Sequence, residues 1–137
     1  MQNNLQLKDG YFIHHVDASF ITKNLFYILH MPIQMKKYEE LKNEVKNQGK
    51  TIDWTVGMIE KSKMFGMGWI GLADPAGTVK VEGDFIAYKM IGDYKQFKNA
   101  WKKIMTDYPK ITEAYHIYMT DPNVTKMEEN ITYIIFK

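Results

Sequence analysis

A histidine and a tyrosine on one short segment are the residues best suited to chemistry in this chain. His116 and Tyr118 are separated by one residue in Tyr115-His116-Ile117-Tyr118, a segment rich in β-prone residues. Neighbouring residues of a strand point to opposite faces, so His116 and Tyr118 are expected to share one face. An imidazole beside a phenol could transfer protons near neutral pH or hold a ligand by hydrogen bonds.

Most other kinds of catalytic or metal site lack the residues they need. The chain has no cysteine, which excludes disulfides, thiolate metal ligands and a cysteine nucleophile. It also lacks the His-Glu-x-x-His, P-loop and Gly-x-Ser-x-Gly patterns. His14 and His15 are adjacent on a predicted strand, so they point to opposite faces and are not expected to ligate one metal. We therefore expect no metal and no cofactor.

Composition and charge predict an ordinary globular protein. The 137 residues have a formal net charge of +2, with lysines and acids mixed along the chain, so no nucleic-acid surface is expected. The most apolar stretch, Met64 to Ala73, is too short to span a bilayer, and the N-terminus lacks a secretory signal pattern. We expect one cytoplasmic domain over residues 1–137 without a membrane segment. The residues do not indicate the oligomeric state.

Two βαββ units in tandem are predicted. After an N-terminal extension, residues 1–24, the first unit covers 25–78 and the second 79–137. An offset of 59 residues aligns Phe26 with Phe85 and brings the elements of both units into step. Amphipathic spacing predicts helices over 35–48 and 94–107, the second capped by Asp93 and Gln96 and ended by Pro109. The predicted strands are Tyr11–Val16, Leu25–Met31, Trp54–Glu60, Phe65–Leu72, Val79–Val81, Phe85–Ile91, Glu113–Met119 and Asn130–Phe136.

The fold class predicted from these elements is α+β. The two units form an antiparallel sheet with both helices on one face, and the opposite face becomes a ligand groove between the repeats. If Tyr115 and Ile117 pack under the second helix with Trp101, then His116 and Tyr118 point into the groove. Trp101 itself is expected to be a core residue.

Three further aromatic residues complete the predicted ligand site. Trp69 shares a strand face with Gly71, so its ring is expected beside a hollow. Tyr88 and Tyr133 are the other expected contacts, although alternation does not decide which face Tyr88 occupies. The predicted ligand-binding residues are therefore His116, Tyr118, Trp69, Tyr88 and Tyr133, and His116 is the only candidate catalytic residue.

The second unit resembles the GyrI-like effector-binding domain. Phe85–Tyr94 (FIAYKMIGDY) looks like the strand and helix entry of that family, Tyr115–Tyr118 followed by Asp121-Pro122 looks like its Phe-Glu-x-Tyr strand and turn, and Asn130–Lys137 looks like its closing strand. The family includes the small-molecule modules of AraC-type and multidrug-sensing MerR-type transcription regulators, and stand-alone proteins. The resemblance implies a duplicated βαββ fold that binds aromatic, often cationic, lipophilic molecules.

One position departs from the family pattern. The pocket glutamate of Phe-Glu-x-Tyr falls on His116, and a neutral imidazole attracts a cation less than a carboxylate does. Glu60 and Glu113 are the alternatives for that carboxylate. No helix-turn-helix remains, so the residues favour a stand-alone module that senses or sequesters a lipophilic aromatic compound. The alternatives are a small hydrolase of electrophilic lipophilic compounds using His116, and a protein whose groove takes a peptide or another subunit.

Overall fold

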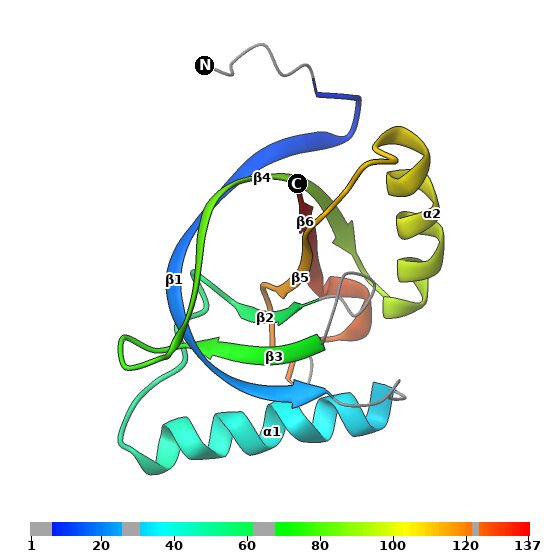
Figure 1. Ribbon diagram of the computed structural model, residues 1–137. Coiled ribbons are helices and arrows are strands. Elements are labelled where there is room, and N and C mark those ends of the chain that lie inside the picture. The colour runs from blue at the N-terminus through cyan, green and yellow to red at the C-terminus, as the bar shows by residue number, and fades with distance from the viewer. Residues whose placement is uncertain (1–6, 26–30, 62–67, 122–123) are drawn as a thin grey trace.

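A closed antiparallel barrel with two helices on its outside forms the fold (Figure 1). The computed structural model describes residues 7–25, 31–61, 68–121 and 124–137. Within these ranges the elements in chain order are β1 (Tyr11–Leu25), α1 (Met31–Asn47), β2 (Met58–Lys61), β3 (Gly68–Ala73), β4 (Val79–Ile91), the 3-10 turn η2 (Tyr94–Gln96), α2 (Phe97–Asp107), β5 (Ala114–Tyr118), the 3-10 turn η3 (Met127–Glu129) and β6 (Ile131–Phe136).

The long strand β1 closes the barrel. The strand order around the barrel is β1-β3-β2-β5-β6-β4, and every neighbouring pair is antiparallel. Residues 11–20 of β1 pair with β4, and residues 20–25 pair with β3. Phe20 is the point of exchange, since it is opposite both Ala73 and Val79. The two parts of β1 therefore pair with different strands, β4 and β3, and this double pairing closes the barrel.

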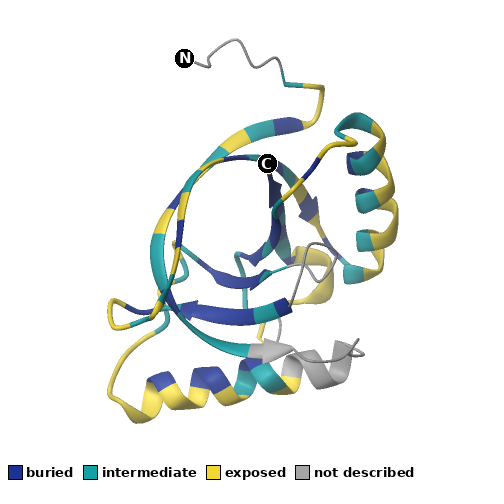
Figure 2. Ribbon diagram, viewed as in Figure 1, coloured by how far each residue is buried: buried dark blue, intermediate teal, exposed yellow. Residues whose placement is uncertain are grey.

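Alternation along each strand separates the interior of the barrel from its outer face. In β5, Tyr115 and Ile117 point inward and join a core cluster made of strand residues alone. Their neighbours on the strand lie on the outer face, where they pack with residues of the helices. In Figure 2, α1 has buried residues on the side towards the barrel and exposed residues on the side away from it. The buried interior residues are Val16, Phe20, Ile59, Val81, Phe85, Ala87, Tyr115, Ile117 and Ile135.

Each helix covers part of the outer face with an apolar stripe. Among the described side chains of α1 the buried apolar residues are Tyr38, Leu41 and Val45, which match the predicted stripe. On α2 they are Ala100 and Ile104. The carboxylate of Asp93 accepts a hydrogen bond of 2.8 Å from the backbone N–H of Lys95, as expected of a helix N-cap. Neither helix is long and apolar enough, over the residues described, to cross a membrane.

The α+β class, the antiparallel sheet and the two helices are confirmed, whereas several boundaries differ. The predicted break between two early strands is wrong, because β1 runs from Tyr11 to Leu25. Its polar residues Asp17 and Ser19 alternate with the inward Val16 and Phe20, so they do not interrupt the strand. Likewise β4 continues through Gly83. Of the predicted strand Leu25–Met31, Leu25 is the last residue of β1, Met31 is instead the first residue of α1, and residues 26–30 lie outside the described residues.

The predicted strand Trp54–Glu60 begins later than expected. Asp53 to Gly57 forms a turn, with the Asp53 carbonyl accepting from the N–H groups of Val56 and Gly57, so β2 starts only at Met58. The predicted strand Phe65–Leu72 corresponds to β3 over its described residues, and residues 65–67 lie outside the described ranges. The turn at Asp74–Gly77 is confirmed by a 2.8 Å hydrogen bond from the Gly77 N–H to the Asp74 carbonyl.

Substitution of Gly57 tests the junction between β2 and β5. Gly57 has φ +86°, and a Cβ there would lie 2.6 Å from the Tyr118 carbonyl oxygen. We expect Gly57→Ala to lower the free energy of unfolding by about 2–5 kcal/mol, from backbone strain and the clash together. Gly49→Ala is the matched control, because Gly49 has φ +74° with nothing within 4 Å, and it should cost only roughly 1–2 kcal/mol. Equal losses in urea denaturation would contradict the clash.

Candidate functional site

The predicted site residues do not share one cavity. His116 and Tyr118 lie on the outer face of β5, beneath the helices, so the expectation that they point away from the helices is wrong. Trp69 and Tyr133 lie on the inner face of the barrel. Tyr88 lies on the outer face of β4 beside α2. The reason is closure: Tyr115 and Ile117 form part of the interior wall and cannot pack under α2.

The hollow expected beside Trp69 is filled by its own ring. A Cβ on Gly71 would meet the Trp69 ring at 3.2 Å. The Trp69 ring centroid lies 6.4 Å from that of Phe20 and 6.0 Å from that of Tyr115, so the three rings occupy the interior together. Gly71 therefore makes room for an indole of the same chain, and the interior here is a packed core.

Tyr133 and Tyr88 also contact residues of the chain itself. The Tyr133 ring lies edge-on to Phe12 and His14, each with a centroid separation of 5.2 Å. The Tyr88 ring lies 5.6 Å from Tyr11 and lines a shallow surface pocket with Lys103. Neither residue adjoins the pair His116 and Tyr118.

His116 has a fixed tautomer. The indole Nε1–H of Trp101 donates to His116 Nε2 at 2.8 Å, and His116 Nδ1 is 3.1 Å from Glu60 Oε1. Because an indole nitrogen can only donate, Nε2 must accept, and the ring proton therefore lies on Nδ1 and is donated to Glu60. The imidazole also stacks on Phe97, with centroids 4.3 Å apart, and its side chain is 14% exposed. Both ring nitrogens are engaged.

Glu60 supplies a buried carboxylate at this place. It is directly opposite His116 in the pairing of β2 with β5, and it is 7% exposed. The hydroxyl of Tyr118 donates to the same Glu60 oxygen at 2.8 Å. Burial of a carboxylate costs free energy unless the carboxylate accepts hydrogen bonds. Here His116 and Tyr118 both donate to Oε1 of Glu60. Of the two alternatives for a family carboxylate, Glu60 shares the face of His116, while Glu113 accepts from Tyr115 instead.

Three tyrosines of this region have a raised pKa. Burial, followed by the charge of Glu60, raises the pKa of Tyr118 and of Tyr38 well above the ordinary value. Burial, together with the charge of Asp121, raises the pKa of Tyr94 to about 12. All three phenols therefore stay protonated at physiological pH and remain hydrogen-bond donors.

These residues form one group between the two helices. The Tyr118 ring lies edge-on to Tyr38 from α1 and to Tyr94 and Phe97 from the α2 side, at centroid separations of 5.5, 5.5 and 6.3 Å. The Tyr94 hydroxyl is buried without a hydrogen-bond partner among the described residues. A buried unpaired hydroxyl is uncommon in a native fold. We call this group the seam cluster; its members are Glu60, His116, Tyr118, Tyr38, Tyr94, Phe97 and Trp101.

A buried ion pair borders the seam cluster. The ammonium of Lys42 lies 3.1 and 3.2 Å from the two carboxylate oxygens of Asp121 and 2.5 Å from Glu39. Lys42 is 4% exposed, and these carboxylates compensate for the burial of its ammonium. The described part of the chain holds no cluster of three His, Asp or Glu residues that could bind a metal ion.

No protein-family model matches this chain, and no curated protein matches its sequence. The resemblance to the GyrI-like domain therefore stays a prediction from the quoted residues.

Sequence reasoning named His116 and Tyr118 of the seam cluster as site residues, and named Glu60 only as one of two alternatives for a carboxylate. Trp101 and Phe97 are four residues apart on the predicted α2 stripe and were expected as core. The signal for Trp101 was its polar indole N–H, which needs a hydrogen-bond partner even where the ring is buried. Nothing in the sequence places Glu60 opposite His116, because strand register between β2 and β5 depends on the whole barrel.

Replacement of Trp101 tests the tautomer of His116. In the unmodified protein, long-range 1H–15N NMR at neutral pH should show Nδ1 protonated and Nε2 unprotonated. Trp101→Phe removes the indole donor, so the fixed tautomer should be lost and the free energy of unfolding should fall by about 1 kcal/mol or more. Trp54→Phe, a half-buried tryptophan packed near α1, is the control and should leave the tautomer unchanged. A protonated Nε2 in the unmodified protein would disprove the assignment.

Proposed function

We propose that this protein is a small-molecule-binding module whose ligand is lipophilic, aromatic and cationic, and that the seam cluster is the binding site. The observation that carries the proposal is the buried Glu60 carboxylate surrounded by aromatic rings. Negative charge in an aromatic, low-dielectric setting favours a cation more strongly than a surface carboxylate does.

The hydrogen bonds donated to Glu60 could be exchanged for contacts with a ligand. Tyr118 and His116 satisfy one carboxylate oxygen in the absence of a ligand, and both are neutral groups that a cation could replace or supplement. The unpaired Tyr94 hydroxyl offers a further hydrogen bond to a polar ligand atom. Aromatic faces from Phe97 and Trp101 supply apolar contact for a planar ring system.

The resemblance to the GyrI-like domain agrees with this proposal once the carboxylate is assigned to Glu60. In the family pattern the glutamate lies at the position of His116. Here Glu60 lies directly across the strand pair from that position, so a carboxylate occupies the same neighbourhood from β2. A cationic ligand therefore remains compatible with histidine at position 116.

We also propose that the chain is a duplicated βαββ unit, with β1-α1-β2-β3 as the first copy and β4-α2-β5-β6 as the second. The strand order supports this, because β1-β3-β2-β5-β6-β4 reads the same from either end when the copies are exchanged. On this assignment the seam cluster lies at the junction of the copies, where β2 pairs with β5. Helix α1 contributes from the first copy and α2 from the second, as expected for a site between repeats.

Binding at this site requires movement of a side chain or a helix. Trp101 and Phe97 lie against His116, so a ligand must displace at least the indole to reach the carboxylate. Both residues belong to α2, which follows Gly92 at φ +111° and a single 3-10 turn. We therefore expect α2 to shift when the ligand binds, with Gly92 as the hinge.

The hydrolase alternative has no observation in its favour. A general base needs a free nitrogen, and both nitrogens of His116 are engaged, by Trp101 and Glu60. Of the other predicted site residues, Tyr118 lies beside His116, and its hydroxyl donates to Glu60. A binding role therefore fits the geometry better than turnover.

Charge-matched ligands and a single carboxamide substitution test the proposal. N-methylacridinium should quench the fluorescence of Trp101 saturably, and neutral acridine, measured at mildly alkaline pH, should bind at least tenfold more weakly. Glu60→Gln should weaken the cation about 10–100-fold, which is the loss of one charged partner of roughly 1.5–3 kcal/mol, and leave acridine unaffected. Trp101→Phe should remove most of the quenching.

Glu113→Gln is the matched control for this substitution. It removes a carboxylate from the strand region of β5 whose partner is Tyr115, on the face opposite the seam cluster. Binding of the cation should be unchanged in Glu113→Gln. Equal affinity for both probes, or equal loss in both variants, would rule out Glu60 as the cation partner.

A further inference from the structure

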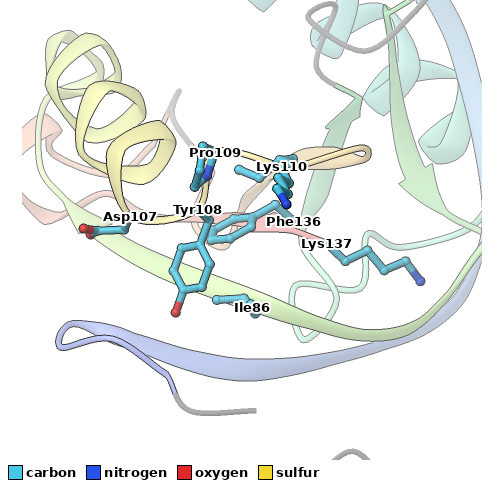
Figure 3. Close-up of a pocket in the computed structure, with 8 residues that line it drawn as sticks. Ile86, Asp107, Tyr108, Pro109, Lys110, Phe136 and Lys137 are labelled. Carbon is cyan, nitrogen blue, oxygen red and sulfur yellow. The ribbon is translucent and has the colours of Figure 1, made fainter.

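A concave site lies at the far end of α2, apart from the seam cluster. It has a volume of about 330 Å³ and opens between the residues that follow α2 and the strands β4 and β6 (Figure 3). It shares no residue with the seam cluster. Its walls are mainly apolar and come from Ile86, Tyr108, Pro109, Ile111 and Phe136. We call it the α2-end cleft.

The walls of the α2-end cleft are held in place by packing and hydrogen bonds. The Tyr108 ring lies 5.3 Å from Phe136 and edge-on to Tyr11 at 5.0 Å. The backbone N–H of Lys8 donates to the Tyr108 hydroxyl at 3.0 Å. Ile111 belongs to the buried core beneath α2. The cleft is therefore largely preformed, as binding sites for small molecules usually are.

The charge available at the rim is positive. Asp107 lines the cleft, but its carboxylate accepts from Lys103 at 2.7 Å and from the Tyr11 hydroxyl at 2.8 Å. The hydrogen bond from Lys103, with that from Tyr11, lowers the pKa of Asp107 below its usual range, so the carboxylate stays charged and paired. In Figure 3 it points away from the other lining side chains.

Two lysines, Lys110 and Lys137, line the cleft. The ammonium of Lys137 lies 4.5 Å from the centroid of the Phe85 ring, a contact that does not neutralise its charge. Lys110 has no hydrogen-bond or ion-pair partner within the residues that the structure describes. The partial negative charge at the C-terminal end of a helix falls off within its last turn, and Lys110 lies three residues beyond Asp107.

We propose that the α2-end cleft binds a medium-chain carboxylic acid as its anion. The hydrocarbon chain lies against Ile86, Ile111 and Phe136, and the carboxylate pairs with the Lys110 ammonium. The volume is near the lower end of the range for small-molecule sites, which favours a medium chain over a long one. The ligand preference is thus opposite in charge to that of the seam cluster, and the two proposals are independent.

Titration with octanoate tests this proposal. Amide resonances of residues 108–111 and of Ile86 should shift saturably in 1H–15N NMR spectra, and those of β2 should not. Decanoate should bind more tightly than octanoate, by about fourfold for each added methylene that the cleft buries. Octyltrimethylammonium, with the same chain length and the opposite charge, should bind at least fivefold more weakly.

Two exposed lysines provide a matched pair of variants. Lys110→Glu should weaken octanoate at least tenfold, whereas Lys102→Glu, an equal change of charge on α2 outside the cleft, should have little effect. Glu60→Gln should leave octanoate binding unchanged, which separates this result from that of the seam cluster. Equal binding of the ammonium probe, equal effects of the two lysine variants, or shifts centred on β2 would each overturn the proposal.

Discussion

Closure of the sheet is the constraint from which the rest of the structure follows. A strand presents alternate residues to its two faces, so a closed sheet commits one set of residues to an enclosed space. With only six strands that space is narrow, and side chains such as Phe20, Trp69 and Tyr115 fill it. Polar groups that serve a function must therefore lie on the outside. Glu60 can be buried there because helices cover the sheet and Tyr118 and His116 supply hydrogen bonds.

Helix α2 connects the chemistry of the two proposed sites. Phe97 and Trp101, in its first turns, cover the aromatic and acidic seam cluster, while Tyr108, just past its end, forms a wall of the apolar and basic cleft. A displacement of α2 at one site would therefore also move residues of the other site. Tyr11 is part of this connection, since its hydroxyl binds Asp107 near the end of α2 and its ring packs against Tyr88 on β4.

Patterns of residues close in sequence predicted the elements of this fold, whereas pairing between distant strands determined where the site residues lie. The stripe of α2, the cap at Asp93 and the turn at Asp74 depend on residues close in sequence, and each was predicted. Alternation correctly paired His116 with Tyr118. The choice of face was wrong, because it depends on whether the sheet closes, and closure depends on contacts between residues as distant as Tyr11 and Tyr88. For the same reason Glu60 could be named only as one of two alternatives.

The division of β1 between two neighbours has a consequence for how the molecule assembles during synthesis. Residues 20–25 can pair with β3 once β3 has left the ribosome, by the register of that pair. Residues 11–20 must wait for β4, which follows in the sequence. Until then the first half of β1 is an open edge of unpaired N–H and C=O groups, the kind of edge that recruits strands from other chains. The outward Asp17 and the exposed His15 on that half are charged or polar at the surface, and such residues oppose intermolecular pairing while the barrel is still incomplete.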